Sequence, residues 1–138
     1  MTAVHRMNAL KQQAGTILLT KGYEPLIVSD TRSSRYSAYD LMAARELSEG
    51  IFDVVMVKLK ISLHPIMSPA EAAVFCRDEI RCTKKFFDHV QGEANPSRFE
   101  VWISVPSNRF LVFEITRDGI REILSPEEQV GLQQGRAA

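Results

Sequence analysis

Hydrophobic and polar positions follow a regular pattern through the first third of the chain. From Val4 to Lys21 the apolar residues recur at helical spacing, which predicts a helix. Gly22 follows directly, at the position where glycine commonly ends a helix. Residues 23–30 predict a strand, which Pro25 confines to the edge of a sheet or to its entry. A polar, basic loop over residues 31–35 follows this strand.

Two more strands are expected over residues 36–44 and 52–62, separated by a charged turn. The second, FDVVMVKLKIS, has the near-continuous apolar run of a strand that is covered on both faces. Side chains alternate along a strand, so Lys58 and Lys60 share one face near its end. Burying a lysine is costly unless its charge is paired or its ammonium reaches water. The pair therefore indicates either a polar pocket or a strand end that is open to solvent.

The second half of the chain begins with a helix-start signal. Ser68, Pro69 and Glu71 form a capping box with proline at the first helical position, so we expect one helix over about 69–90. Residues 98–105 and 109–116 alternate as the two strands of a hairpin. The turn signal Asp118-Gly119 predicts a short third strand, and Ser125 a short terminal helix.

These elements predict an α/β fold with the order α-β-β-β-α-β-β-(β)-α. Strands on both sides of one long crossover helix imply a mixed sheet flanked by helices. The chain has 138 residues, and we expect a single domain over residues 1–132, with 133–138 as a disordered tail.

Composition and net charge limit the classes of protein to which this chain could belong. The 17 basic and 17 acidic residues balance, so net charge does not indicate a strongly basic nucleic-acid binder, although a local basic patch is compatible with it. No run of about 20 apolar residues could form a membrane helix, and no signal peptide is evident. Cys76 and Cys82 point in different directions on the expected helix and cannot pair, which favours a cytoplasmic location.

The segment from Lys21 to Ser62 resembles the restriction-endonuclease-like nucleases, the PD-(D/E)xK group, and most of all the archaeal Holliday-junction resolvases. The shared pieces are the helix ending in KGY, a strand, a polar basic loop, a strand beginning near Asp, and a strand ending in the position of Glu-x-Lys. The resemblance implies a restriction-endonuclease-like fold. It also implies Mg²⁺ bound by carboxylates, and a lysine that stabilises charge on the attacked phosphate.

Carried over by position, Asp40 matches the metal-binding aspartate and Lys60 the catalytic lysine. Lys58 stands where the family has its acidic residue, and a lysine there would repel Mg²⁺. A carboxylate from a neighbouring element could replace it: Glu79 on the long helix and Glu100 on the next strand are the candidates. Asp53 lies on the opposite face of its strand. In the other interpretation, Asp40 pairs with a lysine and has no metal.

Two groups of basic residues could contact nucleic-acid phosphate. The loop carries Arg32, Ser34 and Arg35, which suit a phosphate clamp or an ordinary solvated turn. The long helix carries a basic face, made of Arg77, Arg81, Lys84 and Lys85, which suits a DNA-backbone track or a wet helix face.

Three functions follow from these features. The first is a catalytically impaired nuclease-fold protein that binds nucleic acid, DNA before RNA, through its lysines and arginines. The second is an active Mg²⁺-dependent endonuclease with Asp40, a displaced carboxylate and Lys60. The third is a protein-interaction or structural domain, such as a homodimer, that binds no nucleic acid.

Overall fold

A computed structural model of the protein describes residues 3–28, 39–65, 68–89, 98–106 and 108–123. The described helices are α1 (Ala3–Thr20), α2 (Pro69–Phe75) and α3 (Arg77–His89). The described strands are β1 (Glu24–Val28), β2 (Leu41–Ser48), β3 (Ile51–Ile61), β4 (Arg98–Val105), β5 (Arg109–Thr116) and β6 (Gly119–Ile123). The predicted terminal helix, the tail at 133–138 and the whole basic loop at 31–35 lie outside the described residues.

The strands form a six-stranded sheet in the order β1-β2-β3-β4-β5-β6. Neighbours along the chain pair antiparallel, except β3 and β4, which run parallel and are joined by the crossover through α2 and α3. The predicted α/β class, with a mixed sheet flanked by helices, is confirmed. Pro25 lies in the edge strand β1, as expected, next to an irregularity in the pairing with β2.

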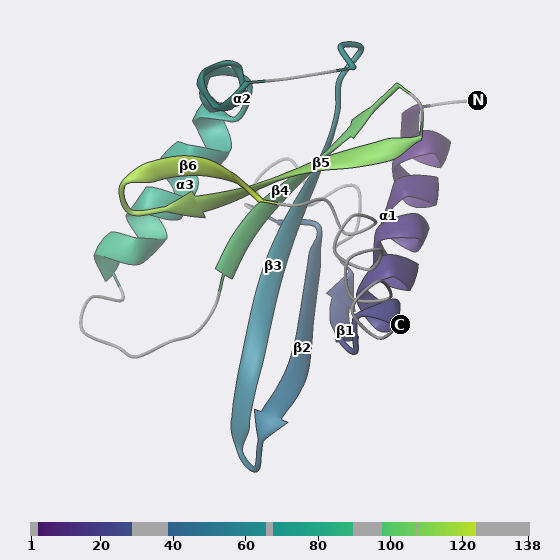
Figure 1. Ribbon diagram of the computed structural model, residues 1–138, viewed down its shortest axis with the longest axis vertical. Coiled ribbons are helices and arrows are strands. Elements are labelled where there is room, and N and C mark those ends of the chain that lie inside the picture. Colours follow the sequence, from purple (N-terminus) through teal and green to yellow (C-terminus); the bar gives the residue numbers. More distant parts are fainter. Residues whose placement is uncertain (1–2, 29–38, 66–67, 90–97, 107, 124–138) are drawn as a thin grey trace, which may run out of the picture.

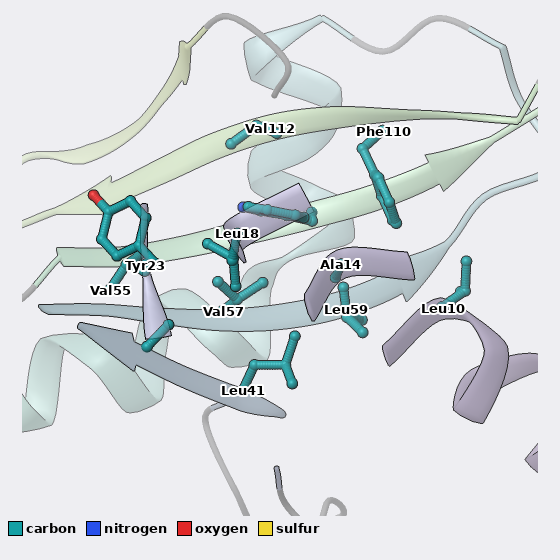
Figure 2. Close-up of a cluster of buried hydrophobic side chains, with 12 residues drawn as sticks. Leu10, Ala14, Leu18, Tyr23, Leu41, Val55, Val57, Leu59, Phe110 and Val112 are labelled. Carbon is teal, nitrogen blue, oxygen red and sulfur yellow. The ribbon is translucent and has the colours of Figure 1, made fainter. Parts of the chain in front are cut away.

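Helices cover both faces of the sheet (Figure 1). On one face, Leu10, Ala14 and Leu18 of α1 pack against alternate residues of β2, β3 and β5 (Figure 2). On the other face, Ala72 and Cys76 pack against the opposite residues of β4 and β5. We refer to these as the α1 face and the α2–α3 face.

Strand β3 shows how strictly alternation divides the two faces. Val55, Val57 and Leu59 are almost fully buried on the α1 face, whereas Lys58 and Lys60 on the α2–α3 face are only partly buried. The expectation of a strand covered equally on both faces is therefore wrong. The α2–α3 layer reaches the lysine end of β3 and lies beside β4 and β5, so this face of β3 keeps its access to solvent.

The expected single helix over 69–90 is two helices. The capping box at Ser68 is present, since its hydroxyl accepts from the Glu71 amide at 3.2 Å while the Glu71 carboxylate accepts from the Ser68 amide. The helix stops at Cys76, which has φ −104° and ψ 21°. Figure 1 shows the two helix axes at a clear angle. No glycine or proline marks this break. The Cys76 side chain is fully buried against the sheet. The change of chain direction at Cys76 lets both α2 and α3 contact the sheet.

The second strand, expected over residues 36–44, has other bounds in the described part of the chain, and residues 36–38 lie outside it. Strand β2 begins at Leu41 and continues to Ser48, through residues predicted to form a turn. Its charged end pairs with the start of β3 and is exposed, because the β2–β3 hairpin extends beyond the helices (Figure 1). No helix covers this end of the hairpin, so its residues are polar and lack the alternation of apolar residues that marks a strand. The hydrophobic pattern therefore did not predict this part of β2.

The predictions for the carboxyl-terminal strands are confirmed. Strands β4 and β5 have the expected bounds, and β6 follows the Asp118-Gly119 turn, where Gly119 has φ 139°. Trp102 on β4 is 1% exposed and belongs to the core on the α1 face. Among the described residues, no helix is long and apolar enough to span a membrane.

Candidate functional site

Asp40 is fixed beside β3 by the main chain. It immediately precedes β2, and its amide donates to the Val57 carbonyl at 2.7 Å, which extends the pairing of Leu41 with Val57. Its carboxylate turns back toward β3, where Oδ2 accepts from the Leu59 amide at 2.8 Å. Asp40 is 1% exposed, so its charge is buried and has a fixed position.

Lys58 forms an ion pair with Asp40. Its Nζ lies 3.7 Å from Asp40 Oδ2, and its side chain is 17% exposed. A buried carboxylate must be paired or protonated, and here it has both an amide donor and an ammonium neighbour. The predicted pairing of Asp40 with a lysine is confirmed for Lys58.

Lys60 is held by the break between α2 and α3. Its Nζ donates to Glu79 Oε1 at 2.5 Å and to the Phe75 carbonyl, at the end of α2, at 2.7 Å. The same ammonium lies 4.4 Å from the centre of the Phe75 ring, within the range of a cation–π contact. Because α2 ends at Cys76, the last carbonyls of this helix are available to accept from Lys60.

The structure therefore places two ion pairs on one face of β3, Asp40 with Lys58 and Lys60 with Glu79, and we call the four residues the lysine–carboxylate cluster. Glu79 is one of the two carboxylates considered as a replacement for the missing acidic residue. The other, Glu100, lies on the α1 face, where Oε1 accepts from the Trp102 indole N–H at 2.9 Å. Only Glu79 of these two is placed to act with Lys60.

Cys76 borders this cluster from the helix break. Burial raises the pKa of its thiol to about 11, although the positive charge of Lys60 opposes part of this rise. The thiol is therefore protonated and unreactive at neutral pH. It fills space behind Lys60 and has no role in acid–base chemistry near pH 7.

The cluster does not fit a Mg²⁺ ion. Mg²⁺ needs several oxygen ligands in octahedral geometry. Asp40 Oδ2 already accepts from the Leu59 amide beside Lys58, and Glu79 Oε1 accepts from Lys60. Within the described residues, no group of three or more His, Cys, Asp or Glu side chains is placed to hold a metal ion. The two lysines balance the two carboxylates, so the cluster has no negative charge left to attract a cation.

The basic face of α3 is exposed. Arg77, Arg81, Lys84 and Lys85 all lie at the surface of this helix, and Arg81 donates to Asp78 at 3.0 Å in an ion pair in which both side chains are about two-thirds exposed. The predicted phosphate-contacting residues Arg32, Ser34 and Arg35 lie outside the described residues. Their relation to the cluster stays a prediction.

Known proteins offer few counterparts to this chain. No family model and no curated protein sequence matches the chain. Among solved structures, the chain is similar to Hjc from Archaeoglobus fulgidus, a Holliday junction resolvase from an archaeal hyperthermophile. The two share 14% identity with a TM-score of 0.42, over 83% of this chain and 84% of the other. A likeness of this degree carries no statement about activity or substrate.

A second charged group lies on the α1 face and was missed from the sequence. Asp53 Oδ2 accepts from the Tyr23 hydroxyl at 2.5 Å and from Arg45 Nε at 3.1 Å, and lies 3.4 Å from Arg98 Nη1. Strand parity placed Asp53 opposite the lysines, and this is confirmed. Its partners come from the residue before β1, from β2 and from β4, so no short motif could have indicated them.

Proposed function

We propose that the protein is a nuclease-fold domain without Mg²⁺-dependent cleavage, and that it binds the phosphate backbone of nucleic acid through basic side chains. The observation that carries this proposal is the ion pair of Lys58 with the buried Asp40, at 3.7 Å. In a nuclease of the family that the sequence resembles, these two strand positions hold the metal. Here a lysine ammonium supplies the positive charge that a metal would bring.

The element order and the placement of Asp40 and Lys60 support the nuclease-like part of the proposal. Asp40 at the start of β2 and Lys60 at the end of β3 lie near one polar cluster, as they would in a metallonuclease. The substitution at Lys58 then removes a metal ligand and adds a competing cation. A static internal cation has no bound water to deliver as a nucleophile, which is why we expect no hydrolysis.

The basic face of α3 supports the binding part of the proposal. Four cationic side chains on one exposed helix face can follow a phosphate backbone, and α3 packs directly over the lysine–carboxylate cluster through Glu79. DNA is the first substrate to test, because the resembled family acts on it. Mixed charge at Asp78 and Asp88 limits the affinity, so binding should be weak at physiological salt.

An active nuclease with a displaced carboxylate is the alternative that one observation favours. Glu79 lies within hydrogen-bond distance of Lys60, at the place where a replacement for the acidic residue would be needed. This alternative requires Lys58 to leave Asp40 when metal binds.

One experiment separates these functions. Fluorescence anisotropy with labelled duplex and four-way-junction DNA should show binding that weakens as NaCl rises from 50 to 200 mM, by about tenfold if two phosphates are neutralised on binding. The variant with Arg77, Arg81 and Lys84 all changed to Gln should lose most of this affinity. Arg109→Gln, an exposed arginine on β5, is the matched control and should bind normally.

Cleavage is measured on the same substrates. We expect no strand scission by the wild-type protein with Mg²⁺ or Mn²⁺. Scission that disappears in Asp40→Asn and Glu79→Gln would establish the active nuclease instead. Binding that is absent at low salt, together with no scission, would leave only the interaction domain.

A further inference from the structure

A cavity of about 290 Å³ opens on the α1 face, beyond the end of α1. It is separate from the lysine–carboxylate cluster, because strand alternation puts its lining on the other side of the sheet. The residues around it come from four strands, β2, β4, β5 and β6, and from the segment between α1 and β1; they are Lys21, Tyr23, Arg45, Arg98, Glu100, Glu114, Arg121 and Ile123.

Positive charge exceeds negative charge around this cavity. Four of the lining side chains are cationic: Lys21, Arg45, Arg98 and Arg121. Two lining carboxylates, Glu100 and Glu114, and the adjacent Asp53 oppose them. Within the described residues this leaves one positive charge in excess.

The carboxylates hold the cations in fixed positions. Asp53 is 6% exposed and binds both Arg45 and Arg98, at 3.1 and 3.4 Å. Glu114 Oε1 accepts from Arg121 at 2.6 Å, across the β5–β6 pair. Arginines that are already held in place lose little conformational freedom when they bind a ligand, which favours affinity.

Arg98 lies at the centre of this arrangement. Its Nη2 donates to the Tyr23 hydroxyl at 2.6 Å; its Nε is buried, has no hydrogen-bond partner among the described residues, and lies 3.5 Å from Glu100 Oε2 in an ion pair. Burial opposes its charge, but the bond to Tyr23 and the nearby carboxylates raise the pKa of Arg98. Burial lowers the pKa of Lys21, which also senses the charges of Arg98 and Arg45. An added anion would relieve this crowding of cations.

We propose that this cavity is a binding site for a small oxyanion, a phosphate or carboxylate group carried by a small polar molecule. Arginine forks match the oxygens of either group. The volume is at the lower end of the range for ligand pockets, which suits a compact ligand. The proposal is independent of nucleic-acid binding on the α2–α3 face.

The single tryptophan gives a direct readout. Trp102 donates its indole N–H to Glu100, which lines the cavity, at 2.9 Å. Titration of the full-length, ¹⁵N-labelled protein with sodium phosphate, and separately with sodium acetate, at constant ionic strength should shift the indole N–H resonance with saturation. The tighter of the two ligands identifies the oxyanion class.

Two variants assign the effect to the cavity. Lys21→Gln and Arg121→Gln should each weaken the binding about tenfold, the usual value of one charged hydrogen bond. The Arg121 side chain is 68% exposed, so its replacement should leave the fold intact. Arg81→Gln, which removes an ion pair of similar exposure on α3, is the matched control and should bind as the wild type does.

The same resonance distinguishes a small ligand from nucleic acid. If phosphate and acetate leave the indole resonance unchanged, or shift it equally in wild type and both cavity variants, the proposal is wrong. A shift caused by duplex DNA alone would also overturn it, and would assign the cavity to the backbone of a nucleic acid.

Discussion

At the scale of the residue, Lys58 decides what the lysine–carboxylate cluster can do. It is one of three charged side chains on a largely apolar strand, and it places a positive charge beside the buried Asp40. Asp40 remains buried beside it, because the Leu59 amide and the ammonium together compensate for the lost water. The ion pair is therefore both a structural contact and the reason that a metal is not expected.

Lys58→Glu tests this directly. Placing a second carboxylate beside Asp40 should destabilise the protein by about 3 kcal/mol in EDTA, because a buried pair is replaced by repulsion. Millimolar Mg²⁺ should restore part of the loss in the variant and have no effect on the wild type. Thermal denaturation with and without Mg²⁺ measures both effects.

Lys58→Gln is the control for Lys58→Glu. It loses the ion pair and gains no carboxylate, so it should be destabilised without any response to Mg²⁺. An equal response to Mg²⁺ in Lys58→Gln and Lys58→Glu would contradict the expectation that this position can hold a metal.

At the scale of the element, the break between α2 and α3 positions the cluster. At the end of the short helix α2, the Phe75 carbonyl accepts a hydrogen bond from the Lys60 ammonium. Glu79, in the first turn of α3, accepts from the same ammonium. A continuous helix would use that carbonyl in its own hydrogen bonding. The capping box at Ser68 then matters more than usual, because a helix as short as α2 has little stability of its own.

Ser68→Ala should lower the free energy of unfolding by about 1 kcal/mol, the usual cost of losing an N-cap. The pKa of Glu71 should rise only in part toward its ordinary value, because the Ser68 backbone amide, which lowers it most, is kept in alanine and only the smaller contribution of the Ser68 side chain is lost. Urea denaturation measures the stability change. Ser48→Ala, at the exposed end of β2, is the matched control and should be neutral. Equal stability of the two variants would show that the cap contributes nothing.

Element boundaries show what the sequence could and could not predict. Strands β3, β4 and β5 followed from apolar alternation, and the cap of α2 from its motif. The break at Cys76 has no local signal, because burial of one side chain against the sheet decides it. Asp40, Lys58 and Lys60 were found from the strand pattern and the family resemblance, and Glu79 was one of two alternatives. The contacts of Asp53 with Arg45 and Arg98 depend on sheet order, which no motif contains.

At the scale of the whole molecule, buried titratable groups set the response to alkaline pH. Burial raises the pKa of Cys76 from 9.0 to about 11, and burial together with the bond to Asp53 raises the pKa of Tyr23 above 10.0. Both groups are neutral when protonated, and the fold favours that form. Their contribution to stability is complete below the unfolded-state pKa and is lost as the pH rises toward the folded-state pKa.

The free energy of unfolding should therefore decrease between about pH 9 and pH 11, because Cys76 and Tyr23 lose their protons more readily in the unfolded chain than in the folded one. Cys76→Ala should show a shallower decrease, because the thiol no longer ionises in the unfolded chain. Cys82→Ala, at an exposed position on α3, should keep the wild-type slope. Urea denaturation across this pH range tests the prediction, and identical slopes in Cys76→Ala and the wild type would contradict it.

The parallel pairing of β3 with β4 has a consequence for how the chain folds. Strands β1 to β3 and strands β4 to β6 are two meanders, each made of neighbours in sequence, and β3–β4 is the seam between them. Local antiparallel contacts form quickly, whereas the seam pairs Val55 with Arg98 and must close the whole crossover. We therefore expect closure of the seam to be the slow event of folding. The Asp40–Lys58 pair can form within the first meander, whereas the Lys60–Glu79 pair needs β3 beside α2 and α3 and so assembles only with the seam.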